Sequence, residues 1–168
     1  VWLGSTRTLD AFTFFFEETN KGFFCAHTYQ YEAGRSTWVI ETTPETWVAS
    51  GFDAMTEDES AAYLEGVFAE HLQGHRLIAN RSIWRNFPTI SCASWRHGKI
   101  VLLGDAKATA HWSIGSGTKL AMECAVALSN AVLQSGKDID AALAAYEQQR
   151  RTPVEITQHN AQVSLRWF

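Results

Sequence analysis

The sequence predicts an α+β fold in which an antiparallel sheet comes first along the chain and long helices come last. The first third alternates aromatic and polar residues at period two, which is typical of strands that bury one face. The last third is rich in Ala and Leu at helical spacing. With 168 residues, of which 46% are hydrophobic, the chain has the size of roughly one domain with a real core.

Three strands are expected within the first 40 residues. Alternating aromatic residues cover 12–17 and 23–31, and residues 36–40 form a third β-rich run. Gly22 and Gly34 lie in the turns between them, where a residue suited to positive φ is needed. One face of the second strand carries five side chains, here called the stripe: Phe23, Cys25, His27, Tyr29 and Tyr31. This stripe is either part of the sheet core or the wall of a pocket for a flat ligand.

Two helices are expected next, because each has recognisable start and stop signals. Pro44 fits a first helical position, and Gly51 fits the stop of that helix. Thr56 and Glu59 form a capping box, behind which apolar residues recur at helical spacing until Gly74. The middle of the chain is therefore predicted to be helical.

No metal site is predicted from the sequence. His71 and His75 lie four residues apart, which places two imidazoles on one face when both residues are helical. Gly74 is expected to end the helix between them, and no third ligand is evident nearby.

The remainder of the chain is predicted to contain three short strands followed by two long helices. Strands are predicted at 83–84, 90–95 and 99–103, the last one buried and preceded by a turn at His97-Gly98. The first long helix is expected from 117 to 134, closed by Gly136. The second begins near Asp138 and extends to about Leu165, and Pro153 should break or kink it.

Charge and composition exclude several functional classes. A net charge of −4 gives no electrostatic basis for binding nucleic acid or an anionic membrane. No apolar run reaches the length needed to span a bilayer, and no signal peptide is evident. The three cysteines are odd in number and widely spaced, which favours a reducing compartment, the cytoplasm. The apolar ends and the missing initial Met suggest a piece of a longer protein, or a listing without its flexible ends.

The most informative segment is a strand, a loop and a helix. The strand ends at Gly104-Asp105, about ten loop residues follow, and Gly115-Ser116-Gly117 opens the helix. A carboxylate at a strand end can accept hydrogen bonds from ligand hydroxyls. Glycines at a helix start let a ligand approach the backbone, where free N–H groups and the helix dipole favour negative charge.

This segment resembles the second FAD-binding motif of the aromatic-ring hydroxylases related to p-hydroxybenzoate hydroxylase. The run Ser-Ile-Gly-Ser-Gly-Thr-Lys-Leu-Ala-Met-Glu at 113–123 is most similar to the subgroup that contains the monooxygenase part of salicylyl-CoA 5-hydroxylase and 2-aminobenzoyl-CoA monooxygenase/reductase. Residues 10–18, 37–47 and 146–153 also resemble this subgroup. The resemblance therefore covers nearly the whole chain.

The resemblance implies the fold and the reaction. Residues 1–98 would form an antiparallel substrate-domain sheet with helices, and residues 99–168 the C-terminal part of an FAD-binding, p-hydroxybenzoate hydroxylase-like domain. The implied activity is hydroxylation of an aromatic acid or its CoA thioester with FAD, NAD(P)H and O₂. The cofactor supplies the difficult chemistry, while the protein orients the substrate and excludes water.

The same resemblance implies roles for individual residues. Gly104 and Asp105 would lie at the ribityl chain, with the Asp105 carboxylate holding its hydroxyls. The cofactor-binding residues at the helix start would be Gly115, Ser116, Gly117, Thr118 and Lys119, of which the last two offer backbone N–H groups to N1 and the C2 carbonyl oxygen of the flavin. His111 and Trp112 would lie near the junction of flavin and substrate, and His27 or Tyr29 would contact the substrate.

Several departures from the family pattern limit these expectations. Lys107 and Ala108 stand where the family usually has Ala-His, and Cys124 stands where it has Asp. The family's N-terminal Gly-x-Gly-x-x-Gly segment, which supplies the AMP and pyrophosphate contacts, is absent from the sequence. The isolated chain is therefore expected to bind FAD poorly.

Other functions remain open at this stage. The chain can be a non-catalytic fragment or a module for aromatic-ligand binding or oligomerisation, and a homodimer is left open. A relationship to flavin-dependent tryptophan or polyketide hydroxylases would change the substrate only.

Overall fold

The structure is a computed structural model in which residues 1–166 are described, so Trp167 and Phe168 of the apolar C-terminal end lie outside the described residues. Two compact units, Val1–Arg85 and Asn86–Phe168, are described separately. The sequence placed the domain boundary after residue 98. Residues 86–98, which lie between the observed and the predicted boundary, form hydrogen bonds within the second unit. For example, the Cys92 N–H donates to Lys107 O at 3.0 Å.

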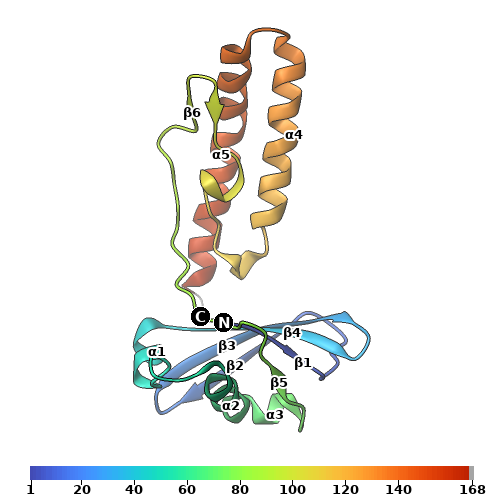
Figure 1. Cartoon of the computed structure of the whole chain (residues 1–168), viewed down its shortest axis with the longest axis vertical. Helices are drawn as coiled ribbons and strands as arrows, with labels where there is room; N and C mark the ends of the chain where they lie inside the picture. Colours follow the sequence, from blue (N-terminus) through green and yellow to red (C-terminus); the bar gives the residue numbers. More distant parts are fainter. Residues whose placement is uncertain (167–168) are drawn as a thin grey trace. The chain divides into compact units, whose positions relative to one another are not determined.

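The first unit is built on a five-stranded antiparallel sheet with the order β2-β3-β4-β1-β5 (Figure 1). The strands are β1 (Trp2–Ser5), β2 (Thr13–Thr19), β3 (Gly22–Glu32), β4 (Arg35–Thr42) and β5 (Leu77–Ile78). The predicted meander of three strands is confirmed as β2, β3 and β4. The short strand β1 was missed, because its four residues include Gly4 and carry no long alternating pattern, yet it pairs with both β4 and β5.

Three helices complete this unit: α1 (Pro44–Ala49), α2 (Glu57–Val67) and α3 (Ala69–Leu72). The predicted capping box of α2 is present, since the Thr56 N–H donates to Glu59 Oε2 at 2.8 Å and the Glu59 N–H donates to Thr56 Oγ1 at 3.3 Å. One helix was expected as far as Gly74. The backbone instead leaves helical geometry at Phe68. The short helix α3 follows, and Gln73, directly after it, adopts the left-handed conformation.

The helices cover one face of the sheet. Phe24 and Ala26 of β3 and Trp38 of β4 are fully buried there, and Leu64 and Phe68 pack against them. Because successive strand residues point to opposite faces, the stripe lies on the other face. The sheet-core interpretation is thus wrong for its outer members, Phe23 and Tyr31, which are exposed, whereas Cys25 and His27 are buried.

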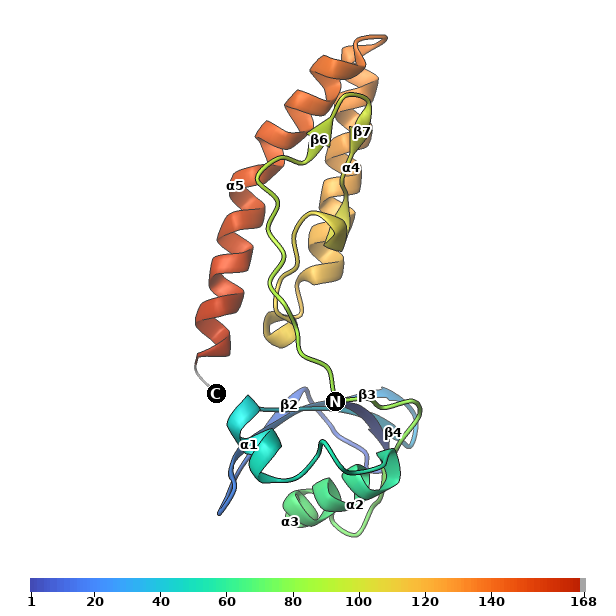
Figure 2. The same cartoon turned by 60° about the vertical axis from the view of Figure 1, so that its left-hand side comes forward.

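The second unit consists of two long antiparallel helices with a small hairpin and two short 3₁₀ turns beside them (Figure 2). Its elements are β6 (Arg96–His97), β7 (Ile100–Val101), η1 (Gly104–Ala106), η2 (Trp112–Ile114), α4 (Gly117–Ser135) and α5 (Ile139–Leu165). The turn at Gly98 and both long helices were predicted. Of the break or kink expected at Pro153, the break does not occur, because α5 continues as a helix on both sides of this residue; a proline removes only one N–H donor, and buried side chains on both sides keep the helix packed.

The strands predicted between residues 83 and 103 are mostly wrong. Residues 83–84 are not a strand, and the run 90–95 makes only an isolated bridge between Ser91 and Ala108. The expected buried strand at 99–103 shrinks to Ile100–Val101, and Ile100 is 69% exposed. A buried strand needs neighbours on its edges, and among the described residues β7 pairs with β6 alone. Apolar composition cannot reveal that in advance.

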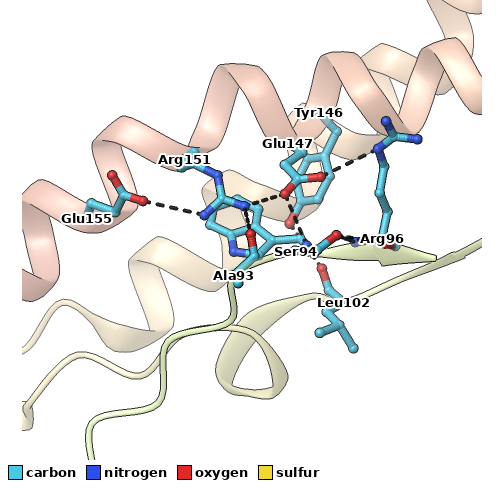
Figure 3. Close-up of polar contacts among 9 residues, drawn as sticks. Ala93, Ser94, Arg96, Leu102, Tyr146, Glu147, Arg151 and Glu155 are labelled. Carbon is cyan, nitrogen blue, oxygen red and sulfur yellow. Dashed lines mark hydrogen bonds and ion pairs between the residues drawn. The ribbon is translucent and has the colours of Figure 1, made fainter.

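Glu147 of α5 holds the segment before the hairpin in place (Figure 3). Its carboxylate accepts hydrogen bonds from Arg151 and from the Trp95 N–H at 3.1 Å, and Arg96 lies 3.5 Å away. Arg151 also donates to Ala93 O at 2.9 Å. Burial by itself would raise the pKa of Glu147, but the bonds from Arg151 and Trp95 outweigh burial and lower that pKa below its ordinary value.

None of the helices within residues 1–166 combines the length and the apolar character required to cross a bilayer.

Candidate flavin-binding site

The predicted carboxylate lies on an exposed turn. Leu103 is extended, and Gly104 then turns the chain with a φ of +58°, a conformation that favours glycine. The Gly104 carbonyl accepts the N–H of Lys107 at 3.2 Å, closing the η1 turn. Asp105 stands exposed at this turn, so its carboxylate is available to a ligand.

The start of α4 offers unsatisfied backbone donors. Gly115 adopts the left-handed conformation with a φ of +60°, and its N–H donates to Trp112 O at 2.8 Å. The N-cap residue is Ser116, whose hydroxyl donates backward to Ile114 O at 3.1 Å and makes no capping bond to the helix. The first-turn N–H groups of Gly117, Thr118 and Lys119 are therefore without a side-chain cap, which is the usual arrangement for binding an anion or a carbonyl oxygen.

Space and proximity at this helix start suit a bound group. A Cβ built on Gly115 or Gly117 would meet no atom within 4 Å. A Cβ on Gly104 would lie 3.7 Å from the Cβ of Ala121 in the second turn of α4, so η1 packs beside the beginning of that helix. Asp105 and the uncapped amides are thus neighbours with open space near them. These residues fit the flavin that the sequence motif implies.

The Lys119 side chain forms an ion pair within α4. Its ammonium pairs with Glu123 at 2.6 Å, one helical turn further on, and Arg150 of α5 pairs with the other oxygen of Glu123 at 2.7 Å. Hydrogen bonds from Lys119 and Arg150 lower the pKa of Glu123. Lys119 consequently offers its backbone N–H, rather than its charge, to a ligand at the helix start.

His111 and Trp112 lie together directly before Gly115. Their ring centres are 5.2 Å apart with an interplanar angle of 30°, and Phe87 meets the His111 ring edge-on at 6.0 Å. The His111 Nδ1 accepts the Ser113 N–H at 3.3 Å. These rings form an aromatic wall beside the helix start.

Two of the residues that depart from the family pattern, Lys107 and Cys124, lie in one buried cluster. Lys107 is 1% exposed and its ammonium lies 3.9 Å from the centre of the Trp95 ring, while Cys124 is fully buried in the same core beside Tyr146. Burial lowers the pKa of Lys107, and the neighbouring Cys124 opposes that effect. The sequence offered no sign that residues 107 and 124 would meet.

In the first unit, His27 is paired and Tyr29 is stacked. The His27 Nε2 lies 2.6 Å from Glu41 Oε1, and Tyr29 stacks on Phe12 with ring centres 5.8 Å apart. Glu41 was missed by the sequence analysis; the hairpin register, which sets Glu41 opposite Cys25, was the signal that could have found it.

The two histidines considered for metal binding have other partners. His71 pairs with Glu17 at 2.7 Å, and His75 Nδ1 lies 2.8 Å from Thr6 Oγ1 beyond the end of α3.

The cysteines are predicted to differ sharply in reactivity. Burial, reinforced by the charge of Glu41, raises the pKa of Cys25 to about 12, and the thiolate is the reactive form. Cys124 is fully buried, whereas Cys92 is partly exposed. Iodoacetamide at pH 8, followed by mass spectrometry, should modify Cys92 first and the other two only after denaturation. Modification of Cys25 or Cys124 ahead of Cys92 in the folded chain would contradict this expectation.

Comparison with known proteins gives a consistent family. The model of a family described as "FAD binding domain" matches residues 2–161. Salicyloyl-CoA 5-hydroxylase from a Streptomyces species is 42% identical over the whole chain, which spans 34% of that relative. A 3-hydroxy-4-methyl-anthranilyl-aryl-carrier protein 5-monooxygenase from Streptosporangium sibiricum is 41% identical over the whole chain, which spans 44% of it.

The solved structures support the fold. Klebsiella pneumoniae HpxO, solved as a complex with FAD, superposes on 97% of the chain with a TM-score of 0.63 and 23% identity, and the chain covers 45% of it. At this identity the likeness shows the fold alone. The chain thus spans between a third and a half of the length of these three proteins.

Proposed function

Because the chain belongs to the FAD-binding-domain family, we propose that it supplies part of an FAD-dependent monooxygenase that hydroxylates an aromatic acid or its CoA thioester. Of two relatives more than 40% identical over the whole chain, one is named as a hydroxylase of salicyloyl-CoA and the other as a monooxygenase of an anthranilyl group on an aryl-carrier protein. The observation that carries the proposal is the exposed Asp105 beside the uncapped start of α4, with open space at Gly115 and Gly117.

In this proposal each part of the site has a separate task. The Asp105 carboxylate accepts hydrogen bonds from the ribityl hydroxyls, and the N–H groups of Thr118 and Lys119 face the N1 and C2 carbonyl end of the flavin ring. The bound FAD supplies the oxygen-transferring chemistry, with NAD(P)H as the reductant. The amide donors and the helix dipole at the start of α4 stabilise negative charge on that end of the ring.

The proposal also assigns substrate contacts and partners. His111 and Trp112 line the junction of flavin and substrate, and His27 and Tyr29 contact the aromatic ring. In this proposal the AMP and pyrophosphate of FAD are bound by an N-terminal segment with a Gly-x-Gly-x-x-Gly fingerprint. The three unpaired cysteines support a reducing, cytoplasmic location.

A second candidate is a module that binds an aromatic ligand without FAD. The exposed rings of Phe12, Phe14 and Phe16 on β2 and the segment before it favour this candidate, since a row of exposed aromatic side chains often marks a binding surface. A purified protein that is colourless but binds an aromatic acid would support the module.

Asp105→Asn is expected to weaken FAD binding in the flavin-loaded protein about 10- to 100-fold. The substitution removes a charged acceptor, and hydrogen bonds to charged groups are worth about 1.5–3 kcal/mol. Titration of flavin fluorescence measures the dissociation constant. The matched control is Asp140→Asn, an exposed aspartate in the first turn of α5, which should leave the dissociation constant unchanged. Unaltered FAD binding in Asp105→Asn would remove the basis of the proposed site.

A further inference from the structure

Four polar side chains on one face of α5 bind the segment 89–95. These side chains, here called the polar ladder, are Glu147, Arg151, Gln158 and Gln162, and their partners are, in the same order, Trp95, Ala93, Ile90 and Thr89. The four hydrogen bonds measure 3.1, 2.9, 2.7 and 2.6 Å, and the first two are drawn in Figure 3. Because a helix turns once in about 3.6 residues, the four ladder positions lie within about 60° of one another around the helix axis.

The polar ladder and the segment 89–95 match in direction and in length. The partner numbers fall as the ladder numbers rise, so the segment runs antiparallel to α5. From Glu147 to Gln162 the helix rises by about 22 Å, and from Thr89 to Trp95 an extended chain covers about 20 Å. The segment is therefore held close to full extension by the side chains of a helix.

Gln158 also reaches the loop between Asp105 and the start of α4. Its Nε2 donates a second, buried hydrogen bond to Thr109 O at 2.8 Å, and the residue is only 8% exposed. A primary amide has two N–H donors, so one nitrogen can serve the carbonyls of Ile90 and Thr109 together. Since both partners only accept, the nitrogen of this amide and not its oxygen must face them.

Thr109 is the place where this loop is attached to the rest of the unit. Its N–H donates to Ile90 O at 3.1 Å, and its Oγ1 donates to Pro88 O at 2.9 Å and accepts the Ile90 N–H at 2.7 Å. Residues 107–111 around it are all buried, whereas Asp105 before them and Gly115 after them are exposed. The loop is therefore fixed in its middle, between the two groups that are proposed to contact the flavin.

We propose that Gln158 is a positioning residue of the flavin site, which fixes Thr109 and thereby sets the Asp105 carboxylate relative to the uncapped start of α4. This inference rests on the proposed function and adds a residue to it. A flavin has to meet the carboxylate and the helix start at the same time, so a small displacement of the loop weakens binding. Without the amide of Gln158, the buried Thr109 carbonyl would lose its donor, and the loop would shift to satisfy it.

The alternative role for Gln158 is stability alone, in which its bonds keep the segment 89–95 on α5 without affecting the cofactor. The two roles differ in a measurable way. A residue that acts through Asp105 loses most of its effect on binding when Asp105 has already been changed, whereas independent effects add.

The test is a double-mutant cycle on FAD binding in the flavin-loaded protein, with the dissociation constant taken from flavin fluorescence. Gln158→Met keeps the length of the side chain and removes both donors. It should raise the dissociation constant about tenfold when Asp105 is present, and less than about threefold in the Asp105→Asn background. Gln158→Glu should raise it at least as much as Gln158→Met, because a carboxylate would then face two carbonyl oxygens.

Two control variants separate positioning from stability. Gln162→Met removes the next member of the ladder, whose partner is the Thr89 hydroxyl and not the loop. Leu143→Ala opens a cavity near the beginning of the same helix, where Leu143 is 4% exposed, and should lower the urea midpoint at least as much as Gln158→Met. At a temperature at which both controls are folded, each should keep the FAD dissociation constant within about twofold of the unaltered protein.

Amide hydrogen exchange gives a readout that does not need the flavin. The Thr109 N–H should exchange faster in Gln158→Met than in the unaltered protein, and the amides in the middle of α4 should exchange at the same rate in both.

A tenfold loss of FAD affinity in both backgrounds would overturn the positioning role. An unchanged dissociation constant in Gln158→Met, or an equal loss in Leu143→Ala, would overturn it as well. An unaltered protein that binds no FAD would instead refute the proposed function. The exchange rate of Thr109 would then still decide whether Gln158 holds the loop, and an unchanged rate would show that it does not.

Discussion

Replacing Trp38 with alanine is expected to lower the free energy of unfolding of the first unit by about 3–5 kcal/mol. Trp38 is fully buried at the centre of the sheet and is the largest buried side chain there. Its ring stacks on Phe15 at 5.3 Å and meets Phe68 edge-on at 6.0 Å, and its Nε1–H donates to Ser36 Oγ at 3.1 Å. Alanine would leave a large cavity and would remove the hydrogen-bond donor to Ser36.

Urea unfolding followed by far-UV circular dichroism measures this loss. The matched control is Trp2→Ala, because Trp2 is 60% exposed on the same sheet and should change the free energy of unfolding by less than about 1 kcal/mol. Trp38→Phe should fall between the two, since it keeps part of the ring packing. Similar midpoints for Trp38→Ala and Trp2→Ala would show that this core does not govern the stability of the first unit.

Replacing Glu147 with alanine is expected to destabilise the second unit by about 2–4 kcal/mol. The carboxylate is mostly buried, and its removal leaves the Trp95 N–H without its acceptor and Arg151 without its main counter-charge (Figure 3). The segment from Ala93 to Arg96 would lose its attachment to α5. Glu147→Gln should cost less, because the amide oxygen still accepts from Trp95.

The control and the pH dependence follow from the same contacts. Glu155 also pairs with Arg151, at 3.5 Å, but it is exposed, so Glu155→Ala should change stability by under about 1 kcal/mol. Because the pKa of Glu147 is lowered in the folded state, its contribution is complete above the ordinary glutamate pKa and is lost as the pH falls through the lowered value. Urea unfolding at pH 7 and pH 3 should therefore show a smaller effect of Glu147→Ala at pH 3.

Local signals in the sequence were read correctly where neighbouring residues alone decide the structure. The capping box at Thr56, the turn at Gly22 and the two long helices depend on contacts within a few residues, and all are present. The strand β1 and the exposed β7 depend instead on which distant segment pairs with them. The few residues of each strand do not indicate which segment will pair with it. For this reason β1 was missed, and β7 was expected to be longer and buried.

The residues of the candidate site also differ in whether a local sequence pattern was enough to predict them. Asp105, Gly115 and Gly117 were identified because a strand end and a glycine-rich helix start have a local sequence pattern, and the structure brings η1 beside α4. The contact between His27 and Glu41 joins residues 14 positions apart on two strands. It depends on the hairpin register, which is set by the turn between β3 and β4 and not by the residues next to either partner.

By itself, the sequence determined the α+β class, the caps and turns, and the glycine-rich start of α4, because each rests on local backbone preference or on a contiguous pattern. Only the tertiary structure decided which face of the sheet is buried, that Lys107 and Cys124 share one core, and that Glu41 contacts His27. These contacts join residues far apart along the chain, and their formation is governed by packing and strand register, which act on the whole unit at once.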